Sequence, residues 1–252
     1  MPATSTNRPP PARRADGLLD GAITFSLGAT VATAAFGHWN GGATGLSLTE
    51  SYVTEYIKQA PRWPWLVVAA FSFAVLLQLL ALAFLRRRTR SWFVPSGCLM
   101  LAAASMATFF AAYSPVRRVA QPPPPAYRWW TPAWWFTSKS AHSPYEIGLA
   151  DAYSDVHYRA TRLVVVTVVA GVLCLGLGHL KESRFRRFAL GSIMAAGVMS
   201  VFFLMGDRLE SHRGLWQRIG FSTLLVWLWL ARNACRRHPN PIPVTPTPTP
   251  PP

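Results

Sequence analysis

The chain has 252 residues, of which 51% are hydrophobic and 14% charged, and its formal net charge is +15. The charged residues lie between long apolar stretches, which excludes an ordinary soluble domain, because the helices of such a domain need a polar face. The basic residues flank those stretches and form no run interleaved with exposed aromatic residues, so we expect no nucleic-acid binding.

Six apolar stretches are predicted to cross a membrane as helices. Each approaches the ~20 residues that a helix rising ~1.5 Å per residue needs to span a ~30 Å hydrocarbon layer. The predicted fold is therefore all-α, a polytopic membrane bundle with six transmembrane helices over residues 17–232. In chain order the stretches are Leu18–Phe36, Leu66–Leu85, Val94–Tyr113, Leu163–Leu180, Phe188–Met205 and Leu215–Ala231.

The positions of Lys and Arg predict the orientation of the bundle. Four segments hold more than half of the 25 basic residues but only three of the ten acidic ones. They are the amino-terminal tail, the connections 86–90 and 181–187, and the carboxyl-terminal segment from Arg232. Because Lys and Arg near helix ends favour the cytoplasmic side, we expect both termini in the cytoplasm, with the protein in a bacterial cytoplasmic membrane.

The two tails and the first helix have distinct compositions. Residues 1–16 are rich in Pro, Arg and Ala, and residues 233–252 are rich in Pro, so both tails are expected to be disordered. Small residues recur every four positions on the first and fifth helices, and such ridges let helices approach closely in lipid. These ridges are expected to pack inside the molecule, and they comprise Ala22, Ser26, Thr30 and Ala34, then Ser192, Ala196 and Ser200.

The outer connections span residues 37–63, 114–162 and 206–214. In the first, Ser47-Leu48-Thr49-Glu50 resembles a capping box and predicts a short helix. In the second, Ser143-Pro144-Tyr145-Glu146 predicts the start of a helix that continues into the fourth crossing. The same connection carries a tryptophan cluster that is predicted to lie at the outer surface and to contact lipid or a partner subunit, namely Trp129, Trp130, Trp134 and Trp135.

Ionisable residues gather in and beside the outer connections. The chain has no H-E-x-x-H, G-x-S-x-G or paired-His spacing, so we assign no catalytic residue and no metal site. A solvated charge network is the expected arrangement, and an enzyme or transporter site is the alternative. The candidate outer polar cluster comprises Glu55, Asp155, His157, Asp207, Glu210 and Arg218.

Three ionisable residues lie inside the predicted helices, and burial there is costly unless each has a partner. Asp20 is expected to pair with Arg13, with Arg14 or with a neighbouring helix, whereas Arg218 is expected to have a buried partner. His179 lies at the inner end of the fourth crossing. The cysteines at 98, 174 and 235 show no C-x-x-C spacing, so we expect no disulfide and no cofactor.

Three short motifs stand at comparable places in a known family. They are Thr54-Glu55-Tyr56 in the first outer connection, His157 before the fourth crossing, and Gln217-Arg218 at the start of the sixth. With these motifs the chain resembles the bacterial six-helix membrane family called domain of unknown function nine-nine-eight. The resemblance spans about residues 17–232. It implies a six-helix fold and an outer polar cluster of Glu55, His157 and Arg218, and it supplies no activity.

The sequence thus favours a non-enzymatic integral membrane protein. We expect an accessory, assembly or scaffolding subunit that packs against other integral membrane subunits, or a protein that binds a lipid-like ligand among the membrane lipids. The missing catalytic spacings, the small-residue ridges and the aromatic outer loop support this interpretation. The alternative is an outer-face enzyme or small-molecule transporter that uses the outer polar cluster.

Overall fold

The computed structural model describes residues 11–38, 63–87, 91–113, 149–208 and 212–237. These ranges contain helices and connecting turns but no strand, which confirms the all-α fold. The elements are α1 (Pro11–His38), α2 (Trp63–Leu85), α3 (Phe93–Tyr113), α5 (Leu149–His179), the 3-10 helix η3 (Ser183–Phe185), α6 (Arg186–Arg208) and α7 (Arg213–Arg237).

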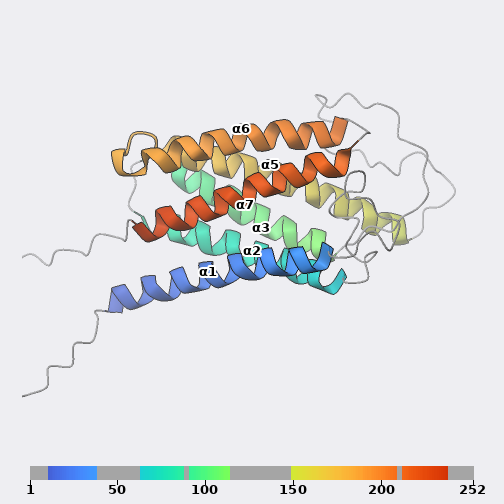
Figure 1. Cartoon of the computed structure of the whole chain (residues 1–252), viewed down its shortest axis with the longest axis horizontal. Helices are drawn as coiled ribbons and strands as arrows, with labels where there is room; N and C mark the ends of the chain where they lie inside the picture. The colour runs from blue at the N-terminus through green and yellow to red at the C-terminus, as the bar shows by residue number, and fades with distance from the viewer. Residues whose placement is uncertain (1–10, 39–62, 88–90, 114–148, 209–211, 238–252) are drawn as a thin grey trace, which may run out of the picture.

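The long helices form a closed ring. Each packs against the next along the chain, and α7 closes the ring by touching both α1 and α2. The start of α1 and the end of α7 lie at the same end of the bundle, on the left in Figure 1. We call this the basic end, because its described residues include Arg86, Arg87, Lys181, Arg184, Arg186, Arg187, Arg232 and Arg236. The opposite end is the distal end.

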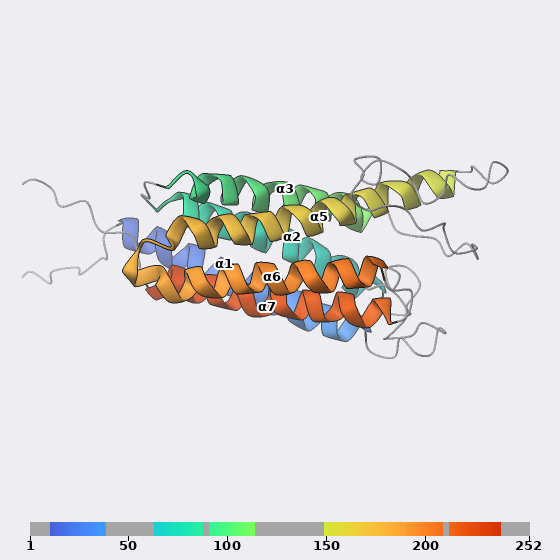
Figure 2. The same cartoon turned by 90° about the horizontal axis from the view of Figure 1, so that it is seen from above.

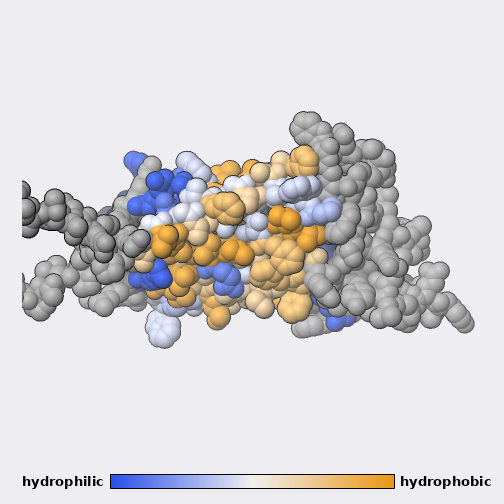
Figure 3. All heavy atoms as spheres, turned by 90° about the horizontal axis from the view of Figure 1, so that it is seen from below, coloured by the Kyte–Doolittle hydropathy of each residue, from blue (hydrophilic) through white to orange (hydrophobic). Residues whose placement is uncertain are grey.

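Among the described residues, five helices are long and apolar enough to cross a membrane. Their spans are Ala15–Phe36, Pro64–Leu85, Phe93–Ala112, Arg159–His179 and Ser183–Met205, close to the first five predicted stretches. On the face seen in Figure 3, hydrophobic residues predominate in the middle of the bundle, and hydrophilic residues gather at the basic end. The helix α7 is not among the five, because polar and basic residues at both of its ends shorten the apolar part; these are Arg213, Gln217, Arg218, Arg232, Arg236 and Arg237.

Three helices, α1, α5 and α7, extend well beyond the predicted apolar stretches. The helix α1 begins at Pro11, so residues 11–16 are helical where the sequence suggested disorder; Pro is favourable at the first helical position, and Ala and Arg favour the helix that follows. The helix α7 continues to Arg237, past the predicted domain end at residue 232. Figure 2 shows α5 projecting past its neighbours at the distal end, as a helix that continues into the fourth crossing should. The expected helix start at 143–146 and capping box at 47–50 lie outside the described residues.

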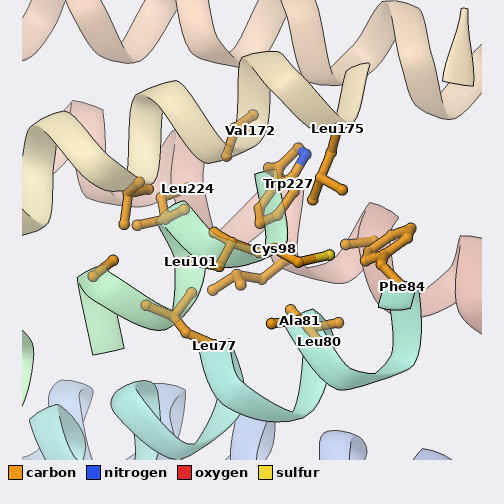
Figure 4. Close-up of a cluster of buried hydrophobic side chains, with 14 of the residues drawn as sticks. Leu77, Leu80, Ala81, Phe84, Cys98, Leu101, Val172, Leu175, Leu224 and Trp227 are labelled. Atoms are coloured by element: carbon orange, nitrogen blue, oxygen red, sulfur yellow. The ribbon is translucent and has the colours of Figure 1, made fainter. Parts of the chain in front are cut away.

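The core lies where α2, α3, α5 and α7 meet, and Figure 4 shows their side chains converging. Trp227 of α7 is 0% exposed, although α7 is not among the apolar spans. Its indole Nε1 donates a hydrogen bond to Ser192 Oγ at 2.9 Å, and Ser192 Oγ donates to the Phe188 carbonyl at 2.8 Å. A buried hydrogen bond thus connects α7 to α6 in the centre of the bundle.

Small residues decide which helices approach closely. A Cβ atom on Gly97 of α3 would lie 2.9 Å from Leu175 Cγ and 3.0 Å from the Gly171 carbonyl oxygen of α5, so the α3–α5 contact requires glycine there. The predicted ridges also pack inside the molecule: Ser26 and Thr30 of α1 are buried, as are Ser192 and Ala196 of α6. The prediction that these ridges face neighbouring helices is confirmed.

Candidate functional site

A cavity of about 210 Å³ lies at the basic end, between α1, α2 and α7. We call it the basic-end cavity. Its apolar lining comes from Leu19, Ile23 and Ala83. Its charged lining comes from two carboxylates and three guanidinium groups, on Asp16, Asp20, Arg86, Arg87 and Arg236. The cavity is therefore amphipathic, with one more cation than anions.

Asp20 connects the wall of the cavity formed by α1 to that formed by α7. Its Oδ2 lies 3.2 Å from Arg236 Nε, so its partner is on a neighbouring helix, one of the alternatives that the sequence left open. Asp20 Oδ1 is buried and has no hydrogen-bond partner among the described residues. One helical turn farther from the basic end, Arg232 Nε of α7 donates to Thr24 Oγ1 of α1 at 2.9 Å. These polar bridges join α1 and α7, whose direct packing is otherwise sparse.

Arg87 joins the end of α2 to the last turn of α7. Its Nη2 donates to the Cys235 carbonyl at 2.7 Å and to the Ala234 carbonyl at 3.3 Å. The last carbonyls of a helix lack partners within the helix, and a cation there also opposes the negative end of the helix dipole. Arg87 Nη1 is buried and has no hydrogen-bond partner among the described residues. Arg87 therefore lines the cavity with part of its donor capacity unused.

The cavity is lined by a permanent cation, Arg87, and by an unreactive thiol, that of Cys235. Burial lowers the pKa of Arg87 from its ordinary value, yet a guanidinium remains charged at any physiological pH. Burial raises the pKa of the Cys235 thiol to about 11. Because the thiolate is the nucleophilic form of cysteine, Cys235 is not an activated nucleophile at neutral pH.

Two aromatic rings lie beside the guanidinium group of Arg87. Its guanidinium carbon lies 5.1 Å from the centre of the Phe185 ring and 5.7 Å from that of Phe84. The buried His179 ring lies 4.7 Å from Phe185, and its Nδ1 is 3.3 Å from Glu182 Oε1. Arg184 also donates to Glu182 at 3.3 Å. These contacts hold the α5–α6 connection against the end of α2, which gives His179 a structural place.

Of the predicted outer polar cluster, the structure describes the side chains of His157 and Arg218. His157 is 0% exposed, and its Nδ1 lies 2.7 Å from the Ala111 carbonyl of α3, where a protonated Nδ1 would donate. Arg218 Nη1 donates at 2.9 Å to the Gly214 carbonyl of its own helix, α7. The other members of the cluster and the tryptophan cluster fall outside what the structure describes. This holds for the side chains of Asp155 and Asp207, and for the whole of Glu55, Glu210, Trp129, Trp130, Trp134 and Trp135.

Sequence reasoning identified Asp20 but missed the cavity beside it. The arginines at 86, 87 and 236 read as topology signals, because basic residues flank every membrane helix on one side. Asp20 is the signal that could have identified these arginines as cavity residues. It is an acid inside an apolar helix, at the end of the bundle where the basic residues gather. The described ranges bring no three His, Cys, Asp or Glu side chains together as a metal site would.

Comparison with known proteins identifies a family. A family described as a protein of unknown function, DUF998, matches residues 23–232. The match begins in α1 and ends in α7, so it includes all or part of every long helix. No curated protein and no solved structure matches significantly. The resemblance seen in the sequence is confirmed, and the chain belongs to the DUF998 family.

Proposed function

We propose that this DUF998 protein is a non-enzymatic component of the bacterial cytoplasmic membrane that binds a lipid-like molecule in the basic-end cavity. The observation that carries the proposal is the amphipathic lining of that cavity, with arginines beside Leu19, Ile23 and Ala83. A soluble metabolite needs no apolar wall, whereas an amphiphile uses both parts of such a lining.

The proposal includes six crossings, with α7 as the sixth. The central part of α7 is apolar and its Trp227 lies in the core, so α7 crosses wherever its neighbours cross. Because Lys and Arg favour the cytoplasmic side, the basic end faces the cytoplasm, and both chain termini lie there. The basic-end cavity then lies at the level of the inner headgroups, where anionic lipids attract basic side chains at about 1 kcal/mol per residue.

Two other functions follow from the sequence. An accessory or scaffolding subunit would use the tryptophan cluster at 129–135 to contact another integral protein. An outer-face enzyme or transporter would need the outer polar cluster to converge on one cavity. We favour lipid binding, because it alone rests on a cavity formed by described side chains.

Native mass spectrometry of the full chain, extracted in a mild detergent, tests the proposal. We expect the wild-type protein to retain a lipid-sized adduct, and Ala83→Phe to lose it, because Ala83 lines the cavity and a phenyl ring there would fill it. Ala32→Phe is the matched control, because Ala32 is exposed on α1 away from the cavity. A wild-type protein without any adduct, or an equal adduct in both variants, would refute lipid binding at this place.

A further inference from the structure

We infer that the basic-end cavity seats the phosphate-bearing headgroup of an anionic lipid, whose acyl chain leaves sideways between α1 and α7. This inference rests on the proposed function and names the ligand class. The volume of about 210 Å³ is below the roughly 300–1,000 Å³ of pockets that enclose a whole drug-sized ligand. The cavity is thus large enough for a headgroup, and the chains must lie elsewhere.

The donors of the cavity suit a phosphate. The planar fork of a guanidinium matches two oxygens of a phosphate, and such charge-assisted bonds are about twice as strong as neutral ones. The Asp20 carboxylate is already paired with Arg236, which reduces its repulsion of a bound anion. Arg87 Nη1 lacks a partner among the described residues, and Arg86 is exposed on the same rim. The cavity also holds one unused acceptor, Asp20 Oδ1, but its surplus of one positive charge and the unused donor of Arg87 favour an anion over a zwitterion.

The boundary between α1 and α7 offers a sideways opening. Thr24 faces α7, since it accepts a hydrogen bond from Arg232. Gly17, Gly21 and Gly28 share that face of α1, because they are seven, three and four residues from Thr24. A Cβ atom on any of the three would meet no described heavy atom within 4 Å, in contrast to the tight α3–α5 contact at Gly97. The boundary therefore has room beside α1 along several turns.

Apolar side chains flank this opening on α1. Leu18 is 72% exposed and Phe25 is 78% exposed, so both present large apolar surfaces beside the glycines. An acyl chain leaving the cavity would contact these surfaces, while its headgroup stayed with the arginines. The same molecule thus satisfies the charged lining and the apolar flank. A free phosphate would use only the first.

Titration of the purified full chain with three probes, followed by native mass spectrometry, tests the headgroup. The probes are dioctanoyl phosphatidic acid, dioctanoyl phosphatidylcholine and inorganic phosphate. We expect one phosphatidic acid per chain, bound at least about tenfold more tightly than either other probe. Over phosphatidylcholine the advantage is about one extra charge-assisted bond, and over inorganic phosphate it is the burial of the acyl chains. Equal binding of the two lipids would overturn this inference and leave the proposed function standing. Phosphate binding as tightly as phosphatidic acid would overturn the lipid assignment, and no lipid binding at all would overturn both proposals.

Two variant pairs test the residues. Arg86→Gln is expected to weaken phosphatidic acid binding about tenfold, whereas Arg187→Gln removes an exposed arginine at the same end, outside the cavity, and should leave it unchanged. Gly21→Leu is expected to weaken lipid binding but not phosphate binding, by filling the opening beside α1. Its control is Ala35→Leu, roughly 21 Å along the same helix and beyond the reach of an eight-carbon chain. Equal effects within either pair would refute the corresponding part of the inference.

Discussion

The hydrogen bond between Trp227 and Ser192 gives the sharpest stability prediction. Both side chains are 0% exposed, and the bond is 2.9 Å long. Ser192→Ala removes the acceptor and leaves a buried indole N–H, a loss that typically costs ~1–3 kcal/mol. Hydrogen bonds between membrane helices measure less in double-mutant cycles, on average ~0.6 and at most ~1.7 kcal/mol, because the unfolded chain in a membrane also finds partners. We expect Ser192→Ala to lower the free energy of unfolding by about 1–2 kcal/mol.

A double-mutant cycle with Trp227→Phe isolates the bond itself. Phenylalanine lacks the N–H donor, so Ser192→Ala should cost less in that background, with a coupling energy of ~0.6–1.7 kcal/mol. Far-UV circular dichroism during denaturation with SDS in mixed micelles is the assay, since the eleven tryptophans make fluorescence unspecific. The control is Ser200→Ala, because Ser200 Oγ donates within its own helix α6, to the Ala196 carbonyl. Equal destabilisation by the two serine variants, together with zero coupling, would show that the reasoning is wrong.

Three further predictions concern packing, chemistry and topology. Gly97→Ala should lower the free energy of unfolding by ~1–3 kcal/mol, because the added methyl group overpacks the α3–α5 contact. Gly28→Ala, where the methyl group enters open space, should change the free energy of unfolding by less than ~0.5 kcal/mol. Equal effects of the two variants in the same unfolding assay would contradict the close approach of α3 and α5. Iodoacetamide should alkylate Cys235 slowly at pH 8, as followed by peptide mass spectrometry. The alkylation rate should rise about tenfold per pH unit toward the pKa of about 11. A rate that levels off near pH 9 would contradict the burial of the thiol. Reporter fusions at residues 10 and 240 should both report the cytoplasm, and opposite locations would refute six crossings.

Sequence patterns and the tertiary structure supply different parts of the information about a candidate site. Sequence patterns reveal which residues share one helix face, so the ridges containing Ser26 and Ser192 could be predicted and are buried. They do not reveal which helices become neighbours. The outer polar cluster, which groups His157 and Arg218 as ionisable residues beside the outer connections, stays a prediction, because most of its side chains lie outside the described residues.

The apolar lengths and the basic segments of the sequence by themselves determined the all-α class and the five apolar spans. This is possible because a bilayer sets the length of a crossing, and each stretch meets that requirement locally. Only the tertiary structure placed Asp20, Arg87 and Arg236 around one cavity, since they belong to α1, to the turn after α2 and to α7, which are far apart along the chain. It also placed the most polar long helix, α7, with Trp227 in the core, because the buried hydrogen bond to Ser192 satisfies the indole there. Side-chain complementarity between helices, which no single stretch contains, decided both.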